Sequence, residues 1–189
     1  QPFGIGPTAG GPIYGIFACT KDFLRLMPGR IVGQSIDTNG KTAYTLTLST
    51  REQHIRRHRA TSNICSNETL IALMGAMHMA LLGPVGLEKL STRILASTVR
   101  TMNQISSIEG VELAFPNSPV FREFAIKIPG KSEDALSHMD KLGVTAGFDL
   151  GNWWKDKSSW ILVGCDERTS ELDIKALKDA LKSWVEESR

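Results

Sequence analysis

The sequence predicts a mixed α/β fold that ends in a small α+β domain, and three patterns along its 189 residues lead to this class. A hairpin pattern lies at residues 30–48, a long apolar helical stretch at residues 66–105, and alternating strand-like and helix-like segments from residue 111 onward. The composition of 41% hydrophobic and 22% charged residues is typical of a folded globular chain and excludes wholesale disorder. The β-β-α-β-α order of the last segments predicts a small antiparallel sheet with helices on one face.

Two short elements are expected before the hairpin. The apolar run Ile13–Cys19 has the length and composition of a buried strand. Asp22–Met27 is expected to form a short helix, because the Pro28-Gly29 step that follows ends a helix.

Residues 30–48 carry the pattern of an antiparallel hairpin. Two β-rich arms, residues 30–36 and 42–48, flank a turn that contains Asn39-Gly40, a dipeptide that tolerates positive φ. Alternate residues of the second arm are apolar and fall on one face: Tyr44, Leu46 and Leu48. We therefore expect a half-buried antiparallel ribbon.

The next stretch predicts two consecutive helices. Residues 66–82 are apolar nearly all round, so we expect a buried helix there. A second helix follows Gly83-Pro84, and its apolar stripe is expected to be Leu87, Leu90, Ile94, Thr98, Met102 and Ile105. The uncharged run at residues 70–87 contains His78 and is interrupted at Gly83-Pro84, so we interpret it as a buried helix rather than a membrane span.

Strands and helices alternate in the last part of the chain. Strands are expected at residues 111–115, 121–128 and 160–165. A helix is expected at residues 133–142, with Ser132 as its N-cap and Gly143 as its terminator. The last helix begins at Ser170, and its buried stripe is expected to be Leu172, Leu177, Leu181, Trp184 and Val185.

Charge and cysteine content exclude several classes of function. The net charge of +2 gives no overall field that would favour nucleic acid or an anionic membrane. The three cysteines, Cys19, Cys65 and Cys165, form no CxxC pair and no Cys/His cluster, which argues against a disulfide framework and against a zinc site. A reducing, cytoplasmic location fits this pattern, and no metal ligand set is expected.

The densest polar cluster is TREQHIRRHRATSN, residues 50–63. It contains four arginines against the single acidic residue Glu52, and it leads through Thr61, Ser62 and Asn63 into the buried helix. One interpretation is a solvated charged segment followed by ordinary helix capping. The other is a phosphate site, because unpaired N–H groups at a helix start, flanked by cationic side chains, bind anions.

Other polar or reactive residues give weaker signals. Gly10-Gly11-Pro12 matches neither a Walker loop nor a GxGxxG motif. His78 and His138 fit structural roles within helices, and Cys65 has no local partner that would make it a nucleophile. Trp153-Trp154 either anchors the preceding GFDLGN loop or stacks on a ligand. These residues alone do not identify a reaction.

Longer motifs do point to a family. The segments GGPIYGIFA (10–18), MPGRIVG (27–33), TREQHIRRHRATSNIC (50–65), LLGPVGL (81–87) and GFDLG (147–151) closely resemble the glycine cleavage system P-protein family. The resemblance is narrower to the alpha-type chain, subunit 1, of the two-subunit glycine dehydrogenase (decarboxylating). It extends along nearly the whole chain.

The resemblance implies a fold and a division of the chain. The fold is the C-terminal portion of a pyridoxal-phosphate-dependent fold type I chain, which is aspartate aminotransferase-like and ends in a small α+β domain. Residues 1–65 would be the end of the large domain with an interdomain hairpin, and residues 66–109 the connecting helices. Residues 110–189 would be the small domain. The strand at Ile13–Cys19 would then belong to the large domain, most of which this chain does not contain.

The resemblance also implies an activity, with partners. Such enzymes are cytoplasmic heterotetrameric oxidoreductases of glycine catabolism, which decarboxylate glycine and pass the aminomethyl group to the lipoyl arm of H-protein. The Schiff-base lysine that holds pyridoxal phosphate belongs to the beta chain (subunit 2). Gln1 stands where that lysine would be, and no lysine precedes Lys21, so we expect no catalytic residue here and no activity of this chain alone. The alternative is a non-catalytic interface and docking module.

The resemblance further sharpens the phosphate interpretation. In related fold type I dimers, a Thr after the interdomain hairpin contacts the neighbour's cofactor phosphate. Thr61, with Ser62 and Asn63 beside it, stands at the comparable place and is expected to bind that phosphate across the subunit interface. A nucleic-acid binder is the third hypothesis, and the low net charge and the absence of interleaved aromatics in the basic run argue against it.

Overall fold

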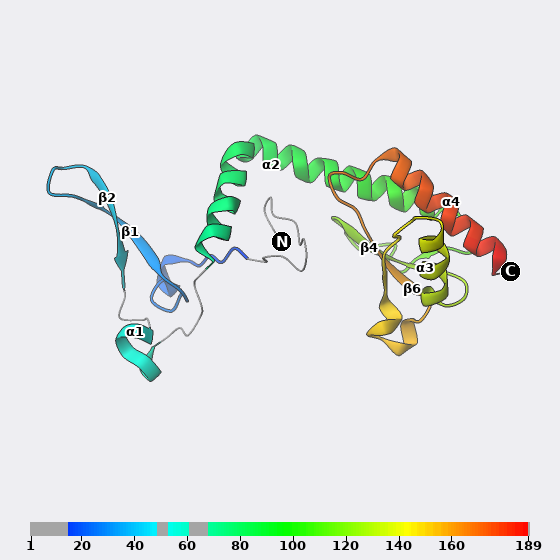
Figure 1. The fold of residues 1–189 in the computed structure, drawn as a ribbon, viewed down its shortest axis with the longest axis horizontal. Helices are drawn as coiled ribbons and strands as arrows, with labels where there is room; N and C mark the ends of the chain where they lie inside the picture. The colour runs from blue at the N-terminus through cyan, green and yellow to red at the C-terminus, as the bar shows by residue number, and fades with distance from the viewer. Residues whose placement is uncertain (1–14, 49–52, 61–67, 189) are drawn as a thin grey trace. The chain divides into compact units, whose positions relative to one another are not determined.

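The computed structural model describes residues 15–48, 53–60 and 68–188 (Figure 1). The chain divides into two compact units, Gln1–Gly83 and Pro84–Arg189, which we call the N-terminal unit and the C-terminal unit. Each unit is described by itself. The three-part division at residues 65 and 109 stays a prediction.

The N-terminal unit contains few regular elements. They are the 3-10 turn η2 (Lys21–Phe23), strands β1 (Ile31–Ile36) and β2 (Thr42–Thr47), the short helix α1 (Gln53–Arg56), the 3-10 turn η4 (Arg57–Arg59) and the first part of helix α2 (Thr69–Ile105). The strand expected at Ile13–Cys19 is wrong over residues 15–19, because none of these residues pairs with another strand; residues 13 and 14 lie outside the described part. The short helix expected at Asp22–Met27 is instead a 3-10 turn that begins one residue earlier.

The predicted hairpin is confirmed. Strands β1 and β2 pair antiparallel, and Val32 lies opposite Leu46. The turn is held by the carboxylate of Asp37, which accepts hydrogen bonds from the backbone N–H groups of Asn39 and Lys41, both at 2.8 Å. Gly40 has a φ of 77°, which explains why the turn needs a glycine there.

The hairpin's apolar face is uncovered, however. Residues directly opposite each other share a face, so the apolar side chains of this face are Val32, Ile36, Tyr44 and Leu46. All four are exposed, and Ile36 and Tyr44 are 73% and 71% exposed. The prediction of a half-buried ribbon is wrong within this chain, because no described side chain packs over this face.

Helix α2 confirms both predicted helices, which join at a break. Gly83 has a φ of 61° and a ψ of −179°, so the helical path is interrupted directly before Pro84. Before the break, α2 is not the buried helix that its composition predicted, and Leu70, Leu73, Met77 and Leu81 are exposed. By length and composition alone, α2 is the one helix in the described ranges that could cross a membrane. An 18-residue window within it has a mean hydropathy of 1.8, and 6% of that window is buried.

The C-terminal unit is a four-stranded antiparallel sheet with helices. After α2 come β3 (Glu112–Leu113), β4 (Glu123–Lys127), α3 (Ser132–Lys141), β5 (Phe148–Asp149), the turns η5 (Leu150–Asn152) and η6 (Lys155–Lys157), β6 (Trp160–Gly164) and α4 (Glu171–Glu187). The strand order is β3-β4-β6-β5, and each neighbouring pair is antiparallel. The three predicted strands and both helices are confirmed, while the short edge strand β5 was not predicted.

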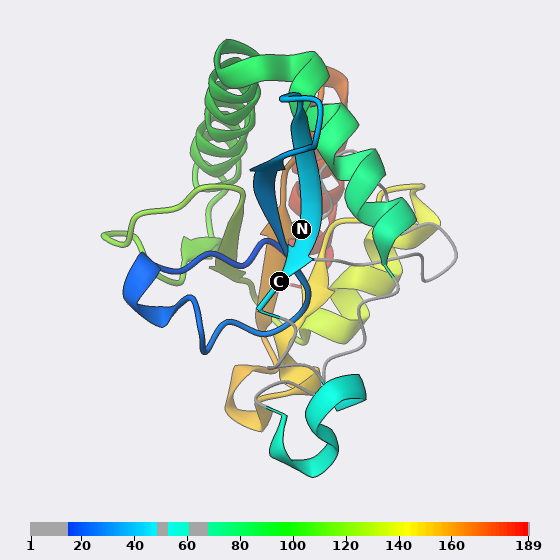
Figure 2. The ribbon, with the colours of Figure 1, turned by 90° about the vertical axis from the view of Figure 1, so that its left-hand side faces the viewer.

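The core lies on one face of this sheet. Phe124 pairs with Val163 and Ile126 with Ile161, and because paired residues share a face, all four point to the same side. They form one buried cluster with helix residues that include Ile105 of α2, Met139 of α3 and Leu181 of α4. Helices therefore cover one face of the sheet, as the element order predicted, and Figures 1 and 2 show these elements together. The opposite face has no helix over it within this unit.

Helix starts agree with the sequence in one case and differ in the other. Ser170 caps α4 in a capping box, accepting from the backbone N–H of Asp173, whose carboxylate accepts in return. The N-cap of α3 is Lys131 rather than Ser132. The Ser132 hydroxyl lies instead within hydrogen-bonding distance of the Asp149 carboxylate and of the Ser158 carbonyl oxygen. This serine therefore connects the start of α3 to β5 and to the segment before β6.

Candidate functional site

The basic segment, residues 53–60, is the described part of the polar cluster that the sequence singled out. Helix α1 and turn η4 place five basic or imidazole side chains within it: His54, Arg56, Arg57, His58 and Arg59. All five are exposed, and residues 53–60 include no carboxylate. The segment is therefore a small positively charged region of the N-terminal unit.

The backbone of the basic segment turns sharply at its centre. Arg57 has a φ of 49°, in the left-handed region that residues with a Cβ seldom adopt. The N–H of Ala60 donates to the carbonyl oxygen of Arg57 at 3.1 Å and closes the turn. Ala60 itself is extended, with φ −63° and ψ 140°. Strained backbone conformations of this kind cluster at functional sites.

The predicted phosphate ligands come directly after this turn. Thr61, Ser62 and Asn63 lie outside the described residues, so their role stays a prediction. The described neighbours fit the phosphate of pyridoxal phosphate, because Arg56, Arg57 and Arg59 supply the charge that a dianion needs. Lys21, in the exposed turn η2, is the first lysine of the sequence.

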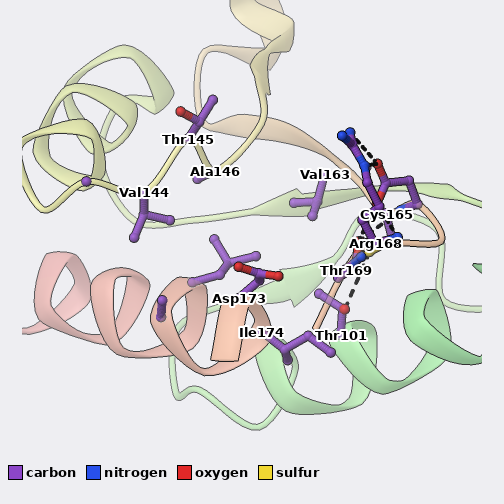
Figure 3. A pocket seen from close by; sticks show the side chains of 15 residues that line it. Thr101, Val144, Thr145, Ala146, Val163, Cys165, Arg168, Thr169, Asp173 and Ile174 are labelled. Carbon is purple, nitrogen blue, oxygen red and sulfur yellow. Dashed lines mark hydrogen bonds and ion pairs between the residues drawn. The ribbon is translucent and has the colours of Figure 1, made fainter. Parts of the chain in front are cut away.

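A second candidate is a pocket of about 440 Å³ in the C-terminal unit (Figure 3). Its walls come from the loop after α3, the end of β6, the loop from β6 to α4, and the first turns of α4. Figure 3 shows Val144, Thr145 and Ala146 on one side and Asp173 and Ile174 of α4 on the other. Its polar side chains are Thr101, Thr145, Cys165, Asp166, Arg168, Thr169 and Asp173.

The Asp166 carboxylate is occupied by its own loop. Burial raises the pKa of Asp166, but hydrogen bonds from the backbone and guanidinium of Arg168, its charge, and the Thr169 hydroxyl outweigh burial and lower the pKa. The two distances from the guanidinium to the carboxylate are 3.0 and 3.2 Å. An ionised carboxylate that already accepts this many hydrogen bonds stabilises the conformation of its loop and has few acceptor positions left for a ligand.

Asp173, Cys165 and Thr101 are also engaged by neighbouring groups of the chain. The Ser170 hydroxyl and backbone N–H donate to the Asp173 carboxylate and lower its pKa. The buried Cys165 thiol donates to the Thr101 hydroxyl at 3.4 Å. The two carboxylates of the pocket and the Thr101 hydroxyl are therefore engaged within the chain, and we assign these side chains to loop and helix structure.

The other residues that the sequence raised are placed as follows. His138 contacts Ser183 through Nε2 at 3.2 Å and the Glu187 carboxylate through Nδ1 at 3.3 Å, so it joins α3 to α4. His78 is half-buried on α2. Gly10-Gly11-Pro12 and Cys65 lie outside the described residues. Within the ranges that the structure describes, no group of three His, Cys, Asp or Glu side chains is placed to hold a metal ion.

One polar network was missed by reading the sequence alone. Asp149 accepts from the backbone N–H of Gly151 at 2.8 Å and contacts Ser132, so a carboxylate in the GFDLG motif fixes the loop to α3. The motif showed that this loop is unusual, but the contact spans 17 positions of sequence and no local pattern predicts it.

Comparison with known proteins identifies relatives along nearly the whole chain. The family model described as "Glycine cleavage system P-protein" matches residues 1–181. A probable glycine dehydrogenase (decarboxylating) subunit 1 from Dictyoglomus turgidum is 41% identical over 186 residues, 96% of this chain. The protein of the same name from Coxiella burnetii is 37% identical over 183 residues, 97% of this chain. The chain spans only 41% of the length of each of these relatives.

Solved structures agree in fold. A glycine decarboxylase (P-protein) of the glycine cleavage system, in inhibitor-bound form, matches with a TM-score of 0.88 and 34% identity over 96% of this chain and 41% of that one. A NifS-like protein matches with a TM-score of 0.51 at 9% identity over 69% of this chain, which shows the fold alone. The predicted class, the C-terminal portion of a fold type I, aspartate aminotransferase-like chain, is confirmed.

Proposed function

Because the chain belongs to the glycine cleavage system P-protein family, we propose that it is the C-terminal portion of the alpha-type subunit of glycine dehydrogenase (decarboxylating). The observation that carries the proposal is the likeness to the glycine decarboxylase structure, at 34% identity over 96% of this chain. The complete subunit would act with a beta chain, as a cytoplasmic heterotetramer. No nucleic acid and no membrane are among the partners we propose.

This chain's part in cofactor binding would be electrostatic. Pyridoxal phosphate would be held covalently by the beta chain, and it supplies an electron sink for the carbanion that forms when glycine loses its carboxylate. Thr61, Ser62 and Asn63 would donate hydrogen bonds to its phosphate from across the subunit interface. The exposed guanidinium groups of the basic segment would add positive potential beside that phosphate.

The second product of the reaction would leave on a carrier. In the proposed reaction, glycine loses carbon dioxide and its aminomethyl group passes to the lipoyl arm of H-protein. We expect no Schiff-base lysine in this chain, because the resemblance places Gln1 at that position, and the two carboxylates of the C-terminal pocket are engaged by their own loop and helix. We therefore assign the chain to cofactor binding and to interfaces rather than to proton transfer.

Reconstitution tests this function. The complete alpha chain, co-expressed with its beta chain and supplied with pyridoxal phosphate and lipoylated H-protein, should release carbon dioxide from carboxyl-labelled glycine. Each chain alone should release none. Release by the beta chain alone at the rate of the pair would contradict a functional role for the alpha-type chain.

Substitution of Thr61 tests the phosphate contact. Loss of one hydrogen bond to a charged group costs about 1.5–3 kcal/mol, so Thr61→Ala in the two-subunit enzyme should weaken pyridoxal phosphate about ten- to hundredfold. Thr92→Ala, at an exposed position of α2, is the matched control and should change neither affinity nor stability. The measurement is titration of the cofactor into each apo complex, with the unfolding midpoint recorded alongside.

The alternative function is a non-catalytic interface and docking module, which the uncovered apolar side chains of the N-terminal unit favour. Unchanged cofactor affinity in Thr61→Ala, together with a lowered unfolding midpoint, would assign Thr61 to helix capping. That result would favour the hypothesis of an interface and docking module over the hypothesis of a phosphate-binding role.

A further inference from the structure

Strands β5 and β6 stop pairing at the edge of the pocket in the C-terminal unit. Phe148 lies opposite Leu162, and β5 begins at Phe148, so the paired region ends there. If the register continued, Ala146 would lie opposite Gly164. Ala146 lies instead in the loop after α3, and both residues line the pocket of about 440 Å³ (Figure 3). The pocket therefore lies where the next pair of the sheet would be.

The main chain of Gly164 points toward this open edge. On the other edge of β6, the N–H of Cys165 donates to the carbonyl oxygen of Arg122 at 2.8 Å. Hydrogen-bonded pairs alternate along an antiparallel ladder, so Val163 also bonds to β4, whereas Leu162 and Gly164 direct their N–H and C=O groups to the opposite edge. Leu162 meets β5 there, but Gly164 has no partner in the part of the chain that the structure describes.

The facing loop also carries unsatisfied main-chain groups. Ala146 is 7% exposed, and within the described residues its N–H and C=O make no hydrogen bond. Buried main-chain groups are nearly always paired, so these two groups indicate a ligand or water. Gly164 has no positive φ, and a Cβ there would meet only Glu123, at an ordinary 3.7 Å. Since no described contact requires this glycine, it is typical of a strand position that another backbone approaches closely.

The pocket combines an apolar wall with one net negative charge. Apolar side chains of the loop, of β6 and of α4 form the wall: Val144, Val163, Ile174 and Leu177. Of the charged side chains that line the pocket, Asp166 and Arg168 pair with each other at 3.0 Å, so the excess charge is that of Asp173. The volume lies within the range of ligand pockets, about 300–1,000 Å³. This lining suits an apolar group with a cationic group beside it.

We propose that the pocket binds a separate peptide in extended conformation, whose main chain pairs with Gly164 and adds a strand to β6. Paired residues share a face and neighbours alternate, so the two residues that flank the paired one direct their side chains toward Val163 and α4. One of them is apolar and packs on the apolar wall, and the other is lysine or arginine and pairs with Asp173. Main-chain hydrogen bonds supply affinity and the two side chains supply specificity. The proposal holds whether or not the chain takes part in glycine decarboxylation.

Titration of the 189-residue chain with two blocked pentapeptides tests the proposal. The probes are acetyl-Ala-Leu-Ala-Lys-Ala-amide and the reversed sequence, so that both strand directions are covered. In nitrogen–proton correlation NMR spectra, the amide signals of Gly164 and Ala146 should shift with one of them. N-methylation of the central alanine removes the paired N–H and should weaken binding about tenfold. Norleucine in place of lysine should weaken it about two- to fivefold.

A pair of substitutions on α4 supplies the matched control. Ala176→Trp places a large side chain at an exposed position that lines the pocket, and it should abolish binding. Lys175→Trp adds the same side chain at the neighbouring exposed position, which does not line the pocket, and it should bind as the wild type does. The N-methylated peptide needs no substitution and keeps the test valid if Ala176→Trp fails to fold.

Three results would overturn the proposal. One is the absence of any shift at Gly164 and Ala146 at about 10 mM peptide, since a Kd below that range is then excluded. Another is equal binding of the N-methylated and unmodified peptides, or binding that survives Ala176→Trp. The third is slow exchange of the Gly164 amide in the complete two-subunit enzyme without added peptide, because the enzyme's own chain would then fill the site.

Discussion

The two units of the chain have similar apolar content but differ in where those side chains lie. In the C-terminal unit, Ile105, Met139, Ile161 and Leu181 are completely buried, and residues from the sheet and all of its helices complete one core. In the N-terminal unit, most of the large apolar side chains of the hairpin and of the first part of α2 are exposed, and none of them is buried. Apolar pattern alone therefore does not decide burial. In this chain, apolar side chains are buried only where the residues that pack against them belong to the chain itself.

The difference matches what the comparisons show. This chain spans 41% of the length of its subunit 1 relatives, and the structurally solved glycine decarboxylase matches it over the same share of its length. We infer that the exposed faces of the N-terminal unit are covered in the complete enzyme. Four predictions are ordered by expected effect: the first two compare the units directly, and the last two test contacts within the C-terminal unit.

The largest effect is expected from the same substitution made in both units. Leu181→Ala removes a side chain that is 0% exposed and should lower the free energy of unfolding by about 2–5 kcal/mol, because it leaves a cavity. Leu46→Ala, at 57% exposure in the hairpin, should change it by no more than about 0.5 kcal/mol. Urea unfolding followed by circular dichroism measures both. Equal losses would show that the hairpin contributes to a core within this chain.

A glycine pair gives the next contrast. A Cβ at Gly147 would meet the carbonyl oxygen of Leu162 at 2.3 Å, so Gly147→Ala should cost about 1–3 kcal/mol by overpacking. A Cβ at Gly15, in the N-terminal unit, would meet nothing within 4 Å, so Gly15→Ala should be neutral. The same urea titration applies. A neutral Gly147→Ala would show that the GFDLG loop is not held against β6.

A smaller effect is expected at the start of α4. Ser170→Ala removes the hydroxyl that caps the helix and should destabilise the C-terminal unit by about 1 kcal/mol. Ser91→Ala is the control, because the Ser91 hydroxyl only donates back to Leu87 within α2. Thermal unfolding midpoints compare the two. A larger loss in Ser91→Ala than in Ser170→Ala would contradict the capping role.

The smallest effect concerns acid stability. The pKa values of Asp166 and Asp173 are both lowered from 3.8, so each carboxylate stabilises the folded state above that pH, and the stabilisation is lost as the pH falls through the folded pKa. The free energy of unfolding should therefore decrease below about pH 4. Asp173→Asn should make that decrease shallower. An identical pH profile for the variant and the wild type between pH 2 and about 5 would contradict this prediction.

The sequence predicted the elements well where the signal was local. The Asn39-Gly40 turn, the start of the last helix at Ser170 and the two strands β4 and β6 each depend on near neighbours in the chain. The class and the family followed from longer motifs such as TREQHIRRHRATSNIC, and the comparisons confirm them.

Long-range features were predicted less well. Burial of the hairpin and of the first part of α2 depends on contacts that this chain does not supply, and residues 15–19 pair with no strand in the described part of the chain. Ser132 is not the cap that the local pattern predicts, because its hydroxyl contacts Asp149, 17 positions away in the sequence. Leu172, expected in the buried stripe of α4, is 79% exposed because it lies at the first turn, ahead of the buried residues. The phosphate role of Thr61, Ser62 and Asn63 stays a prediction.

The central claim is that the C-terminal unit folds on contacts within this chain, whereas the N-terminal unit depends on the rest of the enzyme. Amide hydrogen exchange, measured for the 189-residue chain and for the complete two-subunit enzyme, tests it most directly. In the monomeric chain, β4, β6 and α4 should be strongly protected while β1, β2 and residues 15–19 exchange rapidly. The complete enzyme should protect both sets. Strong protection of β1 and β2 in a verified monomer of this chain would contradict the account.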